Sequence, residues 1–211
     1  MVLLHGFGAP GDDLVPLVKM LSLPAGVRCA FPIAPLELPA FWGESRAWWM
    51  IDTAQLQAAI ASGRQVDISN QSPPGMLEAR TKLVATLRAL RAELGGEDSP
   101  LIIGGFSQGA MLSCDVALRT ELPVSGLVLL SGTLVCAREW RAGALKRAGL
   151  PVFQSHGRSD PLLSFAAAEQ LRELLTEAGL AATWHPFDGA HQIPPQVLEA
   201  LSGFLRRQLG G

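Results

Sequence analysis

The sequence predicts an α/β fold, with a mostly parallel sheet of about six strands and helices on both faces. Two observations lead to this prediction. Continuous apolar runs alternate with stretches of helical periodicity over the second half of the chain, and strands of a parallel sheet read as continuous apolar runs because helices cover both of their faces. The length of 211 residues, with 48% hydrophobic and 17% charged residues, fits one core of ordinary size. We therefore expect a single domain over residues 1–211.

The N-terminal part of the chain predicts two strands separated by a helix. Val2–Leu4 is a short apolar run that ends in a turn beginning at Gly6. Apolar residues then recur at helical spacing over residues 14–21. Residues 27–31 form the second strand candidate.

Residues 32–74 show little periodicity of either kind, although they carry several large aromatic side chains. A segment of this length without regular structure inside a small domain is usually functional or disordered, and the aromatic residues favour an irregular cover over a functional surface. A helix is expected between Pro74 and Gly95, where apolar residues return at helical spacing, and Gly95 and Gly96 are expected to end it.

After Pro100 the chain alternates regularly between strands and helices. Apolar runs predict strands at residues 101–105, 126–130, 152–156 and 183–187. Helical periodicity predicts helices at residues 107–119, 139–148 and 164–178 and in the stretch after Pro194. This alternation is typical of strands that run parallel and are joined by helical crossovers.

The charge balance and the cysteines exclude several classes of protein. The net charge of −2 argues against a nucleic-acid-binding protein, because affinity for a phosphate backbone needs clustered positive charge. Three cysteines without a C-x-x-C pair fit neither a disulfide framework nor a zinc site, so we expect reduced thiols in a cytoplasmic protein. The short apolar N-terminus does not resemble a signal peptide, and no apolar stretch is long enough to span a membrane, so we expect no stable membrane insertion.

The strongest functional signal is Gly105-Phe106-Ser107-Gln108-Gly109, a G-x-S-x-G motif placed between a predicted strand and a predicted helix. In this context the turn holds the serine in a strained conformation, and glycine on both sides lets the strand and the helix approach closely. The position of the motif favours a nucleophilic Ser107 over a structural loop. A serine hydroxyl needs a neighbouring base, and the base needs a carboxylate that orients it.

The four histidines differ in how well their positions suit the base. In hydrolases that carry this motif, the nucleophile, the acid and the base follow one another along the chain, which excludes His5 and His156. His185 lies inside the last predicted strand, where a packed histidine is the better interpretation. His191 lies in the loop after that strand and is therefore the predicted base.

Two carboxylates compete for the role of the acid. Asp160 follows the predicted strand at residues 152–156, as the chain order requires, although an aspartate before a proline also commonly forms a turn. Asp188 lies closer to His191 in the sequence, but Asp-Gly is a common turn pair. The order along the chain favours Asp160.

The oxyanion of the reaction needs backbone N–H donors aimed at the developing charge. One is expected from Gln108, the residue after the nucleophile, and the second from the loop after the first strand, where Phe7 is the candidate donor. Glycines beside Phe7 permit the backbone to approach closely, and the alternative for this loop is a simple turn that ends the strand.

We expect neither a metal nor a cofactor. The sequence contains no H-E-x-x-H motif and no paired-histidine spacing. The glycine-rich stretch around Ser107 lacks the lysine of a phosphate loop and the third glycine of a dinucleotide site. Cys114 follows on the same predicted helix as Ser107 and is expected in the core.

Motifs of this kind extend over nearly the whole chain, as LLHGFG, RAWWMID, GGFSQGAML, LLSGTL, HGRSDPLL and DGAHQIPPQVL. In these segments the sequence resembles the phospholipase/carboxylesterase family of α/β hydrolases, which includes acyl-protein thioesterases and small bacterial carboxylesterases. The resemblance implies an α/β-hydrolase fold, with Ser107, Asp160 and His191 as the catalytic triad. It also implies that Phe7 and Gln108 supply the oxyanion donors.

The resemblance further implies a substrate pocket and a shortened sheet. Trp48 or Trp49, and Leu134 in the region after SGT, match family positions near the acyl pocket. Trp42 lies in the same segment as these two tryptophans, and the alternative for all three is that they fill the core. The family fold usually begins with antiparallel strands before the strand that ends in HG, whereas this chain begins on that strand, so we expect the N-terminal strands to be reduced.

Together these observations predict a serine hydrolase that cleaves carboxylic esters with an apolar acyl chain through an acyl-enzyme on Ser107, with thioesters and lysophospholipids as further candidate substrates. The expected partner is a small-molecule ester or thioester, and we expect a monomer or a weak homodimer. Two alternatives stay open. A lactone hydrolase of the dienelactone type is less favoured because that group typically uses cysteine as its nucleophile. A non-catalytic binding protein of the same fold is less favoured because such proteins usually lack a member of the triad.

Overall fold

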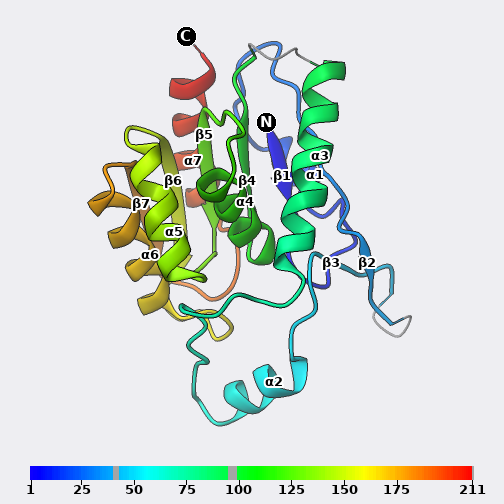
Figure 1. The fold of residues 1–211 in the computed structure, drawn as a ribbon, viewed down its shortest axis with the longest axis vertical. Coiled ribbons are helices and arrows are strands. Elements are labelled where there is room, and N and C mark those ends of the chain that lie inside the picture. Colours follow the sequence, from blue (N-terminus) through cyan, green and yellow to red (C-terminus); the bar gives the residue numbers. More distant parts are fainter. Residues whose placement is uncertain (40–42, 95–98, 211) are drawn as a thin grey trace.

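The computed structural model describes residues 1–39, 43–94 and 99–210, and a parallel sheet forms its centre. Within these residues the sheet has five strands in the order β1-β4-β5-β6-β7, and each neighbouring pair is parallel (Figure 1). The strands are β1 (Val2–Leu4), β4 (Ile102–Phe106), β5 (Gly126–Leu130), β6 (Pro151–Gly157) and β7 (Ala181–Phe187). All five coincide with apolar runs that predicted strands.

Helices cover both faces of this sheet, which confirms the predicted fold class. The helices on one face are α3 (Met76–Leu94), α4 (Gln108–Arg119), α5 (Ala137–Ala144) and α6 (Phe165–Glu177), and those on the other are α1 (Val15–Val18) and α7 (Pro195–Leu209). Successive strand residues serve opposite faces: Ile103 packs with the first group and Ile102 with the second. No helix in the described ranges is both long enough and apolar enough to cross a membrane.

The prediction of a strand at residues 27–31 is wrong, so the sheet has five strands within the described residues where about six were expected. Only Ala30 pairs with the sheet, through a parallel bridge to Val2. Its carbonyl accepts from Leu3 N at 3.0 Å, and its N–H donates to Met1 O at 3.0 Å. The next hydrogen bond of a parallel ladder would have to come from the N–H of residue 32. Pro32 has no N–H, so the ladder ends there.

The segment at residues 32–74 is not irregular throughout, contrary to the expectation. It contains a small antiparallel pair, β2 (Leu36–Glu37) and β3 (Arg46–Ala47), and a helix, α2 (Thr53–Ala61). The Asp52 side chain caps α2 by accepting from Gln55 N at 2.9 Å. None of the nine residues of α2, all of them described, is buried. A helix without a buried face has no amphipathic period, which is why the sequence pattern did not reveal it.

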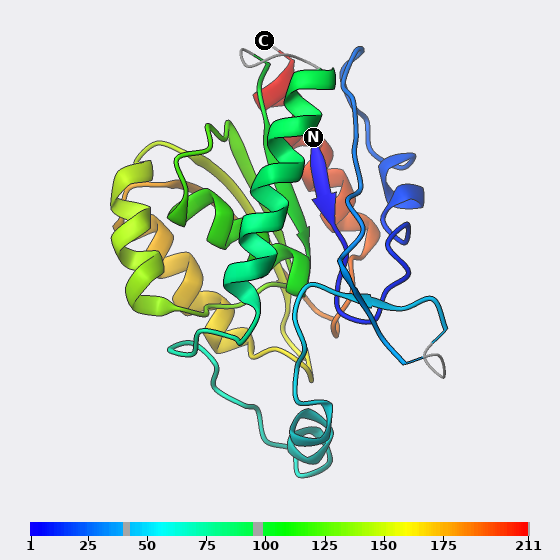
Figure 2. The ribbon, with the colours of Figure 1, turned by 45° about the vertical axis from the view of Figure 1, so that its right-hand side comes forward.

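Helix α2 extends beyond the carboxyl ends of the strands, as Figure 2 shows in cyan at the foot of the molecule. The loops that follow the strands lie at this same end, which is where ligands bind in open α/β sheets. Trp42, Gly95 and Gly96, for which sequence predictions were made above, lie outside the described residues.

A buried carboxylate joins three of the helices that cover the sheet. Asp115 of α4 is fully buried and accepts from Arg80 of α3 at 2.8 Å, from Arg119 at 3.2 Å and from the indole Nε1 of Trp140 in α5 at 2.8 Å. Three donors compensate the charge that burial would otherwise make costly. The network fixes α4, the helix that begins at the proposed nucleophile, against its two neighbours.

Candidate active site

Ser107 occupies a strained turn between β4 and α4. Its backbone has φ 54° and ψ −117°, and in the described part of the chain only Ser131 and Cys136 share a positive φ without being glycine. The Ser107 N–H still donates to Leu130 O at 2.8 Å, so the strand ladder runs up to the turn itself. Such strain at a half-buried serine between a strand and a helix is typical of a nucleophile held at the top of a sheet.

Both glycines of the motif are required by close packing at this turn. A Cβ on Gly105 would lie 2.4 Å from Leu4 O and 2.7 Å from the backbone of Gly109. A Cβ on Gly109 would lie 2.2 Å from Leu4 O and 2.6 Å from His5 O. The strand, the helix and the end of β1 therefore meet closer than any side chain permits, as the motif predicted.

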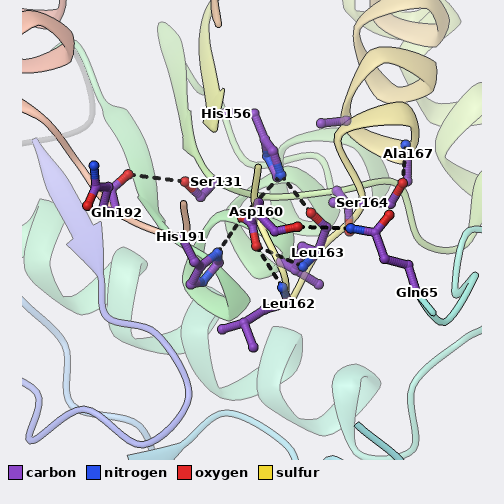
Figure 3. A network of polar contacts seen from close by, with 12 residues as sticks. Gln65, Ser131, His156, Asp160, Leu162, Leu163, Ser164, Ala167, His191 and Gln192 are labelled. Atoms are coloured by element: carbon purple, nitrogen blue, oxygen red, sulfur yellow. Dashed lines mark hydrogen bonds and ion pairs between the residues drawn. The ribbon is translucent and has the colours of Figure 1, made fainter. Parts of the chain in front are cut away.

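Asp160 and His191 are in direct contact. Nδ1 of His191 donates to Oδ2 of Asp160 at 2.6 Å (Figure 3). The two residues come from the loops after β6 and β7, which are neighbours in the sheet. These loops are also joined by their backbones, since Ser159 N donates to Gly189 O at 3.0 Å. The structure thus brings together the acid and the base that the sequence order indicated.

The Asp160 carboxylate is buried and fully hydrogen-bonded. Its Oδ1 accepts from Leu162 N at 2.8 Å and Leu163 N at 3.0 Å, and Nε2 of His156 lies 3.2 Å from its Oδ2. Burial alone would raise the pKa of Asp160, but the hydrogen bonds from His156, His191 and Leu163 lower this pKa well below its ordinary value. The carboxylate is therefore ionised and accepts a hydrogen bond from the Nδ1–H of His191.

The competing residues lie elsewhere. The Asp188 side chain is 97% exposed and faces Arg158, 3.5 Å away, so it does not orient His191. His185 stacks on Phe153, with ring centroids 4.6 Å apart, and burial lowers its pKa. It is a packed strand histidine, as its position in the last predicted strand suggested.

The His191 ring lies beside the nucleophile turn. It packs on the ring of Phe106, the residue before Ser107, with centroids 4.7 Å apart. The loop after β1 lies on the same turn, because a Cβ on Gly6 would be 3.5 Å from the Ser107 Cβ. Ser107, His191 and the loop that carries Phe7 are thus gathered at the carboxyl ends of the strands.

The side chains predicted to line a pocket are buried. Trp48, Trp49 and Leu134 belong to the core cluster between the sheet and α3 to α6, with exposed fractions of 4%, 2% and 6%. Packing in the core, which was the alternative interpretation, accounts for the burial of both tryptophans. A role for these three residues in contacting an acyl chain stays a prediction.

Three side chains in the site were missed by sequence reasoning. Gln65 donates through Nε2 to the backbone O of Asp160 at 2.9 Å, which ties the segment after α2 to the acid loop. His156 lies beside the acid rather than serving as the base, and its Nε2 also donates to Leu163 O at 3.0 Å. The Gln108 side chain contacts the backbone of both Trp48 and Trp49. The position of His156 within the HGRSDP motif could have indicated that it lies near the acid, whereas no feature of the sequence indicated a role for Gln65.

The cysteines of this chain are free thiols, and the described residues hold no cluster of side chains that could bind a metal ion. Burial, followed by nearby Asp115 and Cys136, raises the pKa of Cys114 well above its usual value, so this thiol stays neutral. All three cysteines are described, and all are free. Over residues 1–39, 43–94 and 99–210, no three His, Cys, Asp or Glu side chains group in a way that could hold a metal ion.

The chain is similar to known proteins over almost its full length. The sequence model of the phospholipase/carboxylesterase family matches residues 1–209. Acyl-protein thioesterase 1 of Gibberella zeae is 30% identical over 220 residues, which cover 99% of this chain and 90% of that protein.

Solved structures show the same fold. The crystal structure of esterase PE8 has a TM-score of 0.80 and 28% identity and covers 99% of this chain and 91% of its own. The crystal structure of Zea mays acyl-protein thioesterase 2 has a TM-score of 0.76 and 23% identity and covers 99% of this chain and 93% of its own. These likenesses confirm the predicted α/β-hydrolase fold.

Proposed function

The chain belongs to the phospholipase/carboxylesterase family, and on that basis we propose that it is a serine hydrolase that cleaves carboxylic esters and thioesters of apolar acyl chains. One observation carries the proposal: an ionised, buried Asp160 holds His191 at 2.6 Å beside the strained turn of Ser107. A packing role for these residues would require neither the backbone strain nor the buried charge. The names of an acyl-protein thioesterase and an esterase among its relatives support the same class of reaction.

The geometry supports a triad mechanism. Asp160 accepts a hydrogen bond from the Nδ1–H of His191, which fixes the tautomer whose Nε2 is unprotonated and able to take the proton of the Ser107 hydroxyl. The serine oxygen then attacks the carbonyl carbon of the substrate. His191 next gives its proton to the leaving alcohol or thiol, which departs and leaves an acyl group on Ser107.

Water completes the cycle by attacking the acyl-enzyme. His191 takes a proton from the water and returns it to Ser107, and the carboxylic acid is released. In both halves of the cycle the negative oxygen of the tetrahedral intermediate is stabilised by the backbone N–H groups of Phe7 and Gln108. The Gln108 N–H lies at the N-terminus of α4, where the helix dipole also favours negative charge.

The test is the loss of the proposed nucleophile. Ser107→Ala is expected to lower kcat for p-nitrophenyl esters by at least about a thousandfold, because the remaining groups cannot form the acyl-enzyme. Ser113→Ala is the matched control: this hydroxyl is buried in the same helix and has no hydrogen-bond partner within the described residues. Its loss is expected to leave kcat unchanged. If Ser107→Ala retained wild-type turnover, the proposal would be wrong.

Two further measurements address the substrate and the alternative function. Turnover of p-nitrophenyl esters and acyl thioesters of increasing chain length will define the acyl preference. A fluorophosphonate probe will label Ser107 if the triad activates it, whereas a non-catalytic binding protein will stay unlabelled. Labelling that persists in Ser107→Ala would assign the reactivity to another residue.

A further inference from the structure

The two proposed oxyanion donors lie on separate parts of the chain, yet one short segment contacts both the loop that carries Phe7 and the side chain of Gln108. We propose that residues 46–49, here called the brace, set the distance between the Phe7 and Gln108 donors, and that the side-chain amide of Gln108 is a positioning residue that locks the brace in place. This inference rests on the proposed function, because it concerns the oxyanion site of that reaction.

The brace is first bound to the loop that carries Phe7. Gly8 N donates to Arg46 O at 2.9 Å, and Arg46 N donates to Ala9 O at 2.9 Å. These two bonds join the backbone of Arg46 to both Gly8 and Ala9 and hold the loop in place. The residue directly before Gly8 is the proposed donor, Phe7, so its position is fixed by Arg46.

The brace is next bound to the Gln108 side chain. Trp48 N donates to Oε1 of Gln108 at 2.9 Å, and Nε2 of Gln108 donates to Trp49 O at 2.8 Å. The amide is buried, with 2% of the residue exposed, so water does not compete for these bonds. A two-point contact of this kind fixes the orientation of the glutamine as well as its distance from the brace.

A third connection runs through the Trp48 indole. Its Nε1 donates to His5 O at 3.0 Å, and its ring packs on the His5 imidazole with centroids 5.4 Å apart. His5 is itself fixed in one tautomer, because its Nε2 accepts from Ala34 N at 3.0 Å and its Nδ1 donates to Gly6 O at 2.8 Å. The brace therefore holds the Phe7 loop at both of its ends.

This arrangement matters for catalysis because the two donors must converge on one oxygen atom. Donor groups act well only within a few tenths of an ångström of their productive position, and a displacement of about 1 Å can cost about a hundredfold in rate. The parallel pairing of β1 with β4 brings the two donor segments side by side, and the brace adds hydrogen bonds to the loop that carries Phe7 and to the Gln108 side chain. Loss of the Gln108 amide would free one donor relative to the other.

The experiment compares two buried glutamines. Gln108→Met keeps the length of the side chain and removes both bonds to the brace. Gln154→Met is the matched control, because Gln154 is also buried and its Nε2 donates to Ala168 O at 2.8 Å, away from the brace. A structural role alone predicts that both variants lose similar stability and that neither has a specific effect on kcat.

Positioning predicts a different outcome for Gln108→Met. We expect kcat to fall about 10- to 100-fold with KM within about twofold of wild type. Inhibition by a trifluoromethyl ketone, which forms an oxyanion with the active serine, is expected to weaken by a similar factor. Gln154→Met is expected to keep the wild-type values of both.

A second variant guards against a loss of folding in the first. Trp48→Phe keeps an aromatic ring in the core but removes the indole bond to His5 O together with one of the two fused rings, so we expect a several-fold loss of kcat at constant KM. The proposal is wrong if both variants turn over substrate at the wild-type rate, or if Gln154→Met loses as much kcat as Gln108→Met. Activity that survives in Ser107→Ala would instead overturn the proposed function.

Discussion

Replacing Gly109 with alanine is expected to damage the active site through a backbone clash rather than through lost chemistry. The added Cβ would lie 2.2 Å from Leu4 O and 2.6 Å from His5 O. Contacts between carbon and carbonyl oxygen ordinarily lie at about 3.3 Å or more, so α4 and the end of β1 have to separate by about 1 Å. Neither partner is a flexible side chain that could rotate away.

The size of both effects follows from this displacement. Overpacking of this kind costs about 1–3 kcal/mol, and the higher helix propensity of alanine offsets about 1 kcal/mol of it, so we expect a net loss of about 1 kcal/mol in the free energy of unfolding. The end of β1 leads directly into the loop that carries Phe7. A shift of about 1 Å in that donor is expected to reduce kcat about a hundredfold.

Gly203→Ala is the matched control, since Gly203 is also a helical glycine. Its added Cβ would approach only the far end of the Arg207 side chain, at 3.6 Å. The same substitution is therefore expected to stabilise α7 by about 0.5–1 kcal/mol and to leave kcat unchanged. Thermal denaturation followed by circular dichroism gives the stability difference, and p-nitrophenyl ester hydrolysis gives kcat.

The result that would refute this reasoning is a Gly109→Ala protein that matches Gly203→Ala in both stability and kcat. It would mean that the backbones of α4 and β1 separate at no cost. The close approach of the two would then have no part in placing the Phe7 donor.

Two further substitutions test the charged groups of the fold. Asp115→Ala leaves the Arg80 guanidinium and the Trp140 indole N–H without their acceptor, and we expect it to lower the free energy of unfolding in urea by about 3–5 kcal/mol. Asp115→Asn keeps an acceptor for Trp140 and is expected to lose less stability. Equal losses in the two variants would contradict this account. The pKa of Asp160 is lower in the folded state than in the unfolded state. Its ionised carboxylate therefore stabilises the fold at any pH above the unfolded-state pKa of about 3.9, and this stabilisation is lost as the pH falls below that pKa. Asp160→Asn is therefore expected to reduce the free energy of unfolding at pH 7 and to flatten its decline below about pH 4, and an unchanged slope would show that Asp160 does not contribute.

The sheet could be predicted from the sequence because of how it is buried. Strands covered on both faces must be apolar at every position, so their runs are visible without any knowledge of their neighbours. The strand predicted at residues 27–31 does not form because Pro32 has no N–H to continue the hydrogen bonding to β1. The effect of this missing N–H can be recognised only once β1 is known to be the neighbour. Helix α2 was missed because none of its residues is buried, so it carries no periodic signal.

Some contacts of the candidate site could be predicted from the sequence, and others could not. The order of Ser107, Asp160 and His191 along the chain is imposed by the topology of the sheet, so the sequence alone could place the acid and the base in neighbouring loops. Gln65 and Gln108 contact residues that are far away in the sequence: Gln65 and Asp160 are 95 positions apart, and Gln108 and Trp48 are 60 positions apart. Contacts over such separations leave no local pattern in the sequence. A glutamine in the sequence also does not indicate a buried contact, because glutamine is mostly found on solvated surfaces.

The exposure of α2 has a consequence for how this protein can change over time. A nine-residue helix has only marginal stability in water on its own. Because α2 buries no residue in the core, it can unfold locally while the sheet stays folded. Its backbone amides will exchange with solvent sooner than those of α4, which is buried along almost its whole length. Mutations in α2 consequently cost the fold little. The surface beside the loops of Ser107, Asp160 and His191 can thus change in sequence with little effect on the packing that holds these three side chains.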